Sequence, residues 1–168
     1  MKIGKKIIVI GTSAVGKSTF SKKLSHKIGI PIVFVDSIMW KPWWSYVGDE
    51  EIIKRLDEES KKSEWIIEGF IHKGVRNFIF DRADTIIYLD YHSLISSFRY
   101  IKRWLNHYKI ARPELEGSPD KFSFKFLKLI WKKGEVYSLN KFLLENVQKE
   151  KIIKLTSPLK SKIFLDGI

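Results

Sequence analysis

The chain has 168 residues, of which 44% are hydrophobic and 14% aromatic, so it holds enough apolar material for one packed core and is not expected to be disordered. Its 31 Lys and Arg against 19 Asp and Glu give a formal net charge of +12, which favours anionic partners such as nucleotides, nucleic acid or acidic lipid without choosing among them. The absence of cysteine excludes disulfides, thiolate zinc sites and thiol nucleophiles, and the four histidines lack the spacing of a metal site.

The first apolar run, residues 7–10, follows three lysines and in that respect imitates a signal peptide. It is too short for the apolar region of such a peptide, and Lys17 follows where a cleavable segment would be ending. No uncharged stretch approaches the length of about 18 residues that a membrane span needs. We therefore expect a cytoplasmic protein without a membrane span.

Short apolar runs rich in isoleucine and valine predict the strands of the fold. Their hydrophobic residues are nearly continuous rather than alternating, which is typical of strands buried on both faces of a parallel sheet. The predicted strands span residues 7–10, 32–35, 65–67, 85–89 and 151–155.

Helical periodicity fills the segments between these strands. It is carried by Phe20, Leu24 and Ile28, by Ile52, Ile53 and Leu56 behind Asp49 as a helix cap, and by residues 93–108. Strand and helix thus alternate, which predicts one α/β domain over residues 1–168, built on an open, doubly wound sheet.

A phosphate-binding loop follows the first predicted strand and opens the first predicted helix. The glycines allow backbone N–H groups to surround phosphate oxygens, Lys17 reaches the β and γ phosphates, and the Ser18 hydroxyl can ligate Mg²⁺. A glycine turn without this function would not require Lys17 followed by Ser18. The nucleotide-binding residues predicted here are Gly11, Thr12, Ser13, Ala14, Val15, Gly16, Lys17 and Ser18, which satisfy G-x-x-x-x-G-K-[ST], together with Thr19.

From Gly11 onward the chain resembles the adenylate kinase and nucleoside monophosphate kinase group of P-loop proteins, and most closely the small family labelled DNA topology modulation protein, or FlaR-like. The P-loop is specific by itself, and the other stretches are specific only in combination. The resemblance rests on the P-loop, on residues 35–36 with 40–43, on residues 65–69, on residues 82–90, and on residues 112–117 with the aromatic helix ending at Trp131.

The resemblance implies a three-layer α/β/α P-loop fold with a five-stranded parallel sheet in the order 2-3-1-4-5. It also implies ATP and Mg²⁺ as cofactors, an acceptor-side segment at about residues 37–62, and a short lid at about residues 109–120. Arg112 lies in that lid, where closure would bring it to the phosphates. The alternative for this stretch is a plain surface loop.

Glu68 stands where adenylate kinases have an aspartate that orients the magnesium ion. The resemblance implies that Glu68 and Ser18 hold Mg²⁺, directly or through water, and the alternative for Glu68 is an exposed acid at the end of a strand. Asp90 is a weaker candidate for this role, because in the resembled fold it closes a neighbouring strand.

Arg99 and Arg103 follow Asp90 by nine and thirteen residues, as two arginines do in adenylate kinases. Their i, i+4 spacing puts both on one helix face. The resemblance implies that they contact the nucleotide and neutralise charge on the transferring phosphoryl group. The alternative is a solvated basic face.

Acceptor binding is expected near the end of the second strand, because doubly wound sheets bind ligands at the carboxyl ends of their strands. Asp36 follows that strand and would accept a proton from an alcohol acceptor, or it is a helix cap or a loop acid. Trp40, Trp43 and Trp44 would stack on a flat ring of the acceptor, or they form a small satellite core.

These features predict an ATP-dependent phosphotransferase acting on a small cytoplasmic acceptor, with catalysis by Lys17, Arg99, Arg103 and Arg112. Two alternatives stay open. One is a nucleotide-dependent DNA-binding regulator, which the family label suggests and the net charge permits. The other is a module that binds ATP without turning it over. The sequence leaves the acceptor, the oligomeric state and the preference for ATP over GTP undetermined.

Overall fold

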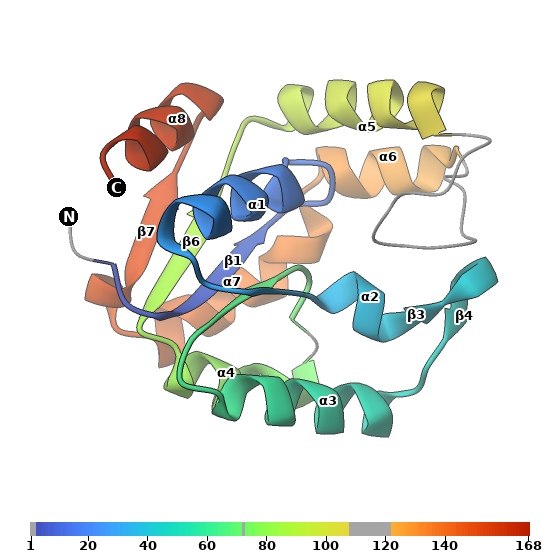
Figure 1. The fold of residues 1–168 in the computed structure, drawn as a ribbon. Coiled ribbons are helices and arrows are strands. Elements are labelled where there is room, and N and C mark those ends of the chain that lie inside the picture. Colours follow the sequence, from blue (N-terminus) through green and yellow to red (C-terminus); the bar gives the residue numbers. More distant parts are fainter. Residues whose placement is uncertain (1–2, 72, 108–121) are drawn as a thin grey trace.

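The computed structural model describes residues 3–71, 73–107 and 122–168 of the chain. A five-stranded parallel sheet lies at its centre (Figure 1), with the strands in the order β2-β5-β1-β6-β7. The strands are β1 (Lys6–Gly11), β2 (Ile32–Phe34), β5 (Trp65–Glu68), β6 (Thr85–Leu89) and β7 (Ile152–Leu155).

Each predicted strand is present, and the five strands of this sheet, counted among themselves, stand in the order 2-3-1-4-5. The labels in Figure 1 are higher because β3 (Trp40–Lys41) and β4 (Ser45–Tyr46), which the sequence did not predict, form a separate antiparallel ribbon. Burial on both faces holds for the inner strands β1, β5 and β6. The edge strands β2 and β7 are only partly buried, because each has a neighbouring strand on one side alone.

Successive residues of β1 point into two different hydrophobic cores, as the two-residue period of a strand requires. Ile7 and Val9 belong to the core under α1 (Lys17–Ile28) and α8 (Pro158–Asp166). Ile8 and Ile10 belong to the core on the other side. The helices over that second core are α2 (Val35–Met39), α3 (Asp49–Lys61), α4 (Arg76–Arg82) and α7 (Gly134–Asn146).

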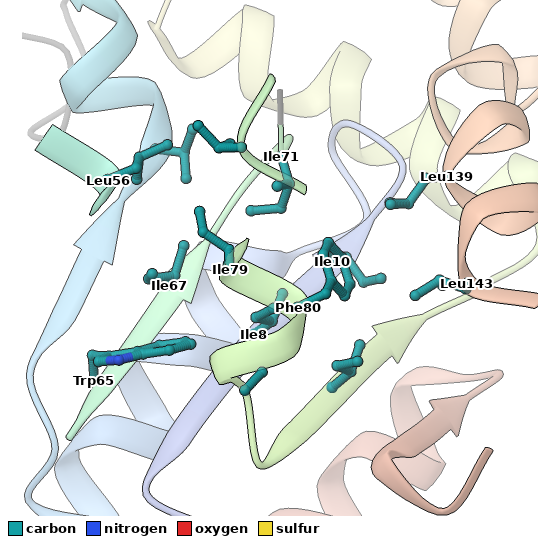
Figure 2. Close-up of a cluster of buried hydrophobic side chains, with 14 of the residues drawn as sticks. Ile8, Ile10, Leu56, Trp65, Ile67, Ile71, Ile79, Phe80, Leu139 and Leu143 are labelled. Carbon is teal, nitrogen blue, oxygen red and sulfur yellow. The ribbon is translucent and has the colours of Figure 1, made fainter. Parts of the chain in front are cut away.

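The second core contains the largest fully buried side chain, that of Trp65 at the start of β5 (Figure 2). Its ring packs with aliphatic side chains of the sheet and of the covering helices. The indole Nε1–H donates a hydrogen bond of 3.1 Å to the carbonyl oxygen of Ser60, so the one polar atom of the ring is satisfied. This core fixes β5, whose far end carries Glu68.

The helices α5 (Ser93–His107) and α6 (Phe124–Trp131) lie side by side (Figure 1). Tyr100 of α5 packs edge-on against Phe126 of α6, with ring centroids 5.3 Å apart. The described residues also form the short 3-10 turns η1 (Pro42–Trp44), η2 (Lys73–Val75) and η3 (Lys149–Lys151). Among the residues described, no helix is both long and apolar enough to cross a bilayer.

Some predicted boundaries differ in detail: β1 is one residue longer at each end than predicted, and β5 continues to Glu68. Val35 opens α2 instead of closing β2, and Lys151 belongs to η3 instead of β7. Asp49 does not cap α3: Gly48 holds the cap position, and the Asp49 carboxylate in the first turn accepts a hydrogen bond from the Tyr46 hydroxyl. An acid in the first turn is still favourable, because it faces the positive end of the helix dipole.

Candidate active site

The P-loop connects β1 to α1 at the carboxyl end of β1. Its two glycines are required by close approaches. A Cβ added at Gly11 would lie 2.5 Å from the backbone oxygen of Leu89, and one added at Gly16, where φ is +103°, would lie 2.7 Å from an Nη atom of Arg99. At these two positions the loop has no side chain, so its backbone can lie close to neighbouring groups and keep the compact form that a phosphate cradle needs.

Lys17 is the first residue of α1, and its ammonium lies against the loop. It donates hydrogen bonds of 3.1 Å to the carbonyl oxygens of Gly11 and Thr12. An ammonium has three donors, so these two bonds fix its position and leave a third direction for an anionic oxygen. The positive end of the α1 dipole points to the same place.

A cavity of about 1050 Å³ opens beside this loop, at the upper end of the range for small-molecule sites. Sequence-predicted residues that line it are Ser13, Ala14, Gly16, Lys17, Ser18, Thr19, Asp36, Glu68, Arg99 and Arg103. They come from the contiguous P-loop and α1 and from α2, β5 and α5, which are far apart in the sequence. The fold thus brings most of the predicted site residues to one cavity.

The two predicted arginines reach the cavity from α5. Arg99 donates a hydrogen bond to the carbonyl oxygen of Val15 in the P-loop, and its guanidinium lies 5.5 Å from the ring centroid of Tyr91. Arg103 lies one turn further along, with its guanidinium 5.6 Å from the ring of Tyr100. Arg99 and Arg103 therefore line the same cavity as Lys17 and add two positive charges to it.

Glu68 ends β5 and is only 5% exposed, so it is not an exposed strand-end acid. It lines the same cavity as Ser18. A carboxylate and a hydroxyl at the phosphate end of a nucleotide cavity fit the oxygen ligands that Mg²⁺ takes, with substrate phosphates and water completing its shell. The residues present therefore fit the predicted magnesium site, and metal binding by Glu68 stays a prediction.

Asp36 lies in the first turn of α2, two residues beyond the end of β2, and lines the cavity as well. The resemblance to kinases placed an acceptor there, and the position of Asp36 is compatible with that role.

The three predicted acceptor-side tryptophans do not line this cavity. Trp40 packs edge-on against Trp44 and Tyr46, with ring centroids 5.8 and 5.5 Å apart, in the β3-β4 ribbon. Trp43 is 79% exposed at the tip of the ribbon. Trp40 and Trp44 thus pack as a small, half-buried aromatic cluster. Contact between the ribbon and an acceptor stays a prediction.

Arg112 and the predicted lid at residues 109–120 lie outside the described residues. The last residue of the predicted helix 93–108, Tyr108, lies outside them too.

Sequence reasoning missed the contributions of α8 and of the outer face of α1. A usable signal existed for α8, because Pro158 follows the last strand at the carboxyl edge of the sheet, where ligands bind. The cavity residues that were not predicted are Phe20, Lys22, Lys23, His26, Lys27, Tyr91, Pro158, Ser161, Lys162, Leu165 and Asp166.

Asp90 is engaged in structural contacts. Its carboxylate is 2.5 Å from the Lys133 ammonium and 2.8 Å from that of Lys154, so it joins β6 to β7 and to the start of α7. It does not line the cavity. Burial by itself would raise the pKa of Asp90, but the hydrogen bonds from the two lysines outweigh burial, and the pKa is lowered.

Replacing Asp90 with Asn is expected to lower the free energy of unfolding at pH 7 by about 1 kcal/mol, since both lysines are partly exposed and solvent screens the pair. Because the folded-state pKa is lowered, this stability is fully present above the ordinary carboxyl pKa of 3.8 and is lost as the pH falls through the folded-state value. Urea unfolding of both proteins from pH 7 downward should show the difference shrinking as the pH falls below 3.8 and vanishing once it is below the lowered folded-state pKa. A constant difference at all pH values would contradict this.

No family model and no curated protein matches the sequence. The fold, however, is similar to several solved structures. A shikimate kinase from Bacteroides thetaiotaomicron superposes with a TM-score of 0.61 at 17% identity, covering 96% of this chain and 94% of that one. A gluconokinase from Sinorhizobium meliloti 1021 gives a TM-score of 0.59 at 13% identity, covering 99% and 94%.

The YorR protein from Bacillus subtilis, in complex with phosphorylated GDP, gives a TM-score of 0.60 at 15% identity, covering 96% of this chain and 91% of that one. At these identities the likeness establishes the fold, which is that of the P-loop kinases. The FlaR-like family is not among these structures, and that part of the sequence resemblance stays a prediction.

Proposed function

We propose that this chain is a P-loop kinase that transfers the γ-phosphate of Mg-ATP to a small cytoplasmic acceptor. The observation that carries the proposal is the convergence of Lys17, Arg99, Glu68 and Asp36 on one cavity. The P-loop kinase fold, and neighbours that are by name a shikimate kinase and a gluconokinase, support a small-molecule acceptor.

In this proposal the cations stabilise charge on the transferring phosphoryl group. The Lys17 ammonium and the Arg99 guanidinium both contact backbone carbonyl oxygens of the P-loop and line the same cavity, so phosphoryl oxygens bound there would gain hydrogen bonds from both. Arg103 adds a third positive charge from the same helix. Because these groups are held by backbone carbonyls and aromatic rings before the ligand arrives, little reorganisation is needed during transfer.

Ser18 and Glu68 would hold the magnesium ion, which neutralises phosphate charge when bound. Asp36 would accept the proton of an alcohol acceptor as its oxygen attacks the γ-phosphorus, while the bond to the β-γ bridging oxygen breaks and ADP leaves. An acceptor that is itself a phosphate needs no strong base. Asp36 would then only help to position that acceptor.

The test is ADP release from Mg-ATP across a panel of nucleosides, nucleoside monophosphates and small hydroxylated metabolites. Stimulation by one acceptor class, with transfer of labelled phosphate to that acceptor, is the expected result. ATP binding without stimulation by any acceptor would overturn phosphotransfer and favour a module that only binds ATP. Loss of DNA affinity with rising salt, in a protein inactive on the whole panel, would favour the DNA-binding regulator.

Replacing Glu68 with Asp should lower kcat/KM for Mg-ATP about tenfold and raise the magnesium concentration needed for half-maximal rate. The shorter side chain draws the carboxylate back from the cavity by one methylene, and Mg²⁺ demands near-ideal ligand geometry. Magnesium titrations of turnover in both proteins would measure this. A large gain in turnover would instead mean that Glu68 is a poorly fitted ligand.

A further inference from the structure

A stripe of exposed apolar side chains runs along the outer face of α5. Leu94, Phe98, Ile101 and Leu105 recur at the i, i+4, i+7 and i+11 positions and are between 38% and 68% exposed. The other two faces of α5 are occupied, one by the α6 contact and one by the arginines at the cavity. The stripe is therefore a third face of α5, packed against nothing in the described part of the chain.

The adjoining helix α6 also carries exposed apolar side chains. Phe124, Leu129 and Trp131 are between 38% and 78% exposed. The end of α6 lies beside the start of α5, because the Ser93 hydroxyl donates a 3.0 Å hydrogen bond to the backbone oxygen of Trp131. We refer to the exposed residues 94, 98, 101, 105, 124, 129 and 131 as the α5-α6 face. None of these residues lines the cavity beside the P-loop.

The charged residues of α5 and α6 are all basic. The exposed lysines Lys102, Lys125 and Lys128 lie on the same two helices, and Lys132 follows the end of α6. The segments of α5 and α6 contain no acidic residue. Several exposed apolar side chains on two adjoining helices, with only basic charges among them, indicate an interaction site for an anionic partner.

We propose that the α5-α6 face binds the surface of an anionic lipid bilayer. Leucine, isoleucine, phenylalanine and tryptophan next to lysines are the composition of interfacial amphipathic helices, whose apolar side enters the boundary of the acyl chains while lysines stay with the head groups. A second copy of the chain would bring the same lysines against one another. Three of the four stripe side chains, those of Leu94, Ile101 and Leu105, are aliphatic and offer no ring for a nucleic-acid base to stack on.

Bound in this way, α5 lies along the membrane surface, and its arginine face remains directed to the cavity. Membrane binding of this kind does not depend on phosphotransfer, so its test needs no acceptor.

The experiment is co-sedimentation of the full chain with vesicles of phosphatidylcholine alone and of phosphatidylcholine mixed with phosphatidylglycerol. We expect at least about tenfold tighter binding to the anionic vesicles, weakening between about 0.1 M and 0.5 M salt. The double variant Phe98→Gln with Leu105→Gln should bind about tenfold more weakly or worse. Lys125→Gln with Lys128→Gln should lose about fivefold per lysine at low salt.

The matched control is Leu144→Gln with Leu159→Gln, which removes two equally exposed leucines from α7 and α8. It should bind like the unchanged protein, and thermal unfolding should show that all variants fold. Equal binding to neutral vesicles, no binding to either kind, or full binding by the Phe98/Leu105 variant would each overturn the proposal. So would a lipid-free dimer that this variant converts to monomers, because the α5-α6 face would then be an interface between copies.

Discussion

Lys17→Ala is expected to lower kcat for ADP release by about 10²- to 10³-fold in the presence of a stimulating acceptor. Its ammonium is held against the P-loop by the carbonyl oxygens of Gly11 and Thr12, so no other described lysine can take over that position. Alanine retains the helix start at α1, and it removes the ammonium together with its two hydrogen bonds to the P-loop.

The matched control for this variant is Lys160→Ala, which removes an exposed lysine of α8 that does not line the cavity. Steady-state kinetics should leave it within about twofold of the unchanged protein, as expected for a surface substitution. Isothermal titration with ATP would separate a loss of binding from a loss of chemistry. A Lys17→Ala protein with nearly normal turnover would contradict the proposed role of the P-loop.

Arg99→Ala is expected to lower kcat by about 10²-fold or more, because an arginine on the transferring phosphoryl group contributes strongly to its transition state. Arg99→Lys should recover part of the rate, since it restores the charge without the planar fork that donates two parallel hydrogen bonds. Single-turnover kinetics of the three proteins would measure the chemical step apart from nucleotide binding.

Lys102→Ala is the control on the same helix, at an exposed position outside the cavity. Arg99 also contacts the Val15 carbonyl oxygen and the Tyr91 ring, so a structural role must be distinguished from a catalytic one. An Arg99→Ala protein with a lower Tm and an unchanged kcat would show that the arginine only braces the P-loop.

The sheet could be predicted because its physical causes are local. The isoleucine and valine runs of β1, β5 and β6 are buried on both faces, and burial of that kind leaves a continuous apolar pattern in the sequence. The P-loop was predictable for a similar reason, since Gly11 and Gly16 meet their close neighbours through backbone geometry that only glycine tolerates.

The β3-β4 ribbon was missed because Trp43 and Trp44 adopt left-handed backbone angles, with φ of +66° and +60°, where glycine or asparagine is the usual residue.

Other features depend on long-range contacts that no local pattern records. The lining of the cavity by α8 was missed because it depends on how the last helix packs against α1. Burial of Glu68 likewise follows from the position of β5 between β1 and β2.

The close approach of Arg99 to Gly16 also bears on how homologous sequences can diverge. The two positions are 83 residues apart in the chain, yet a side chain at position 16 would occupy the space of the guanidinium. Position 16 is nevertheless expected to stay glycine in homologous sequences whatever residue 99 becomes, because its left-handed backbone angle is strained for any side chain, even where a shorter residue 99 leaves room. The constraint between the P-loop and α5 thus runs in one direction: Gly16 leaves space for the arginine, and loss of the arginine does not free position 16.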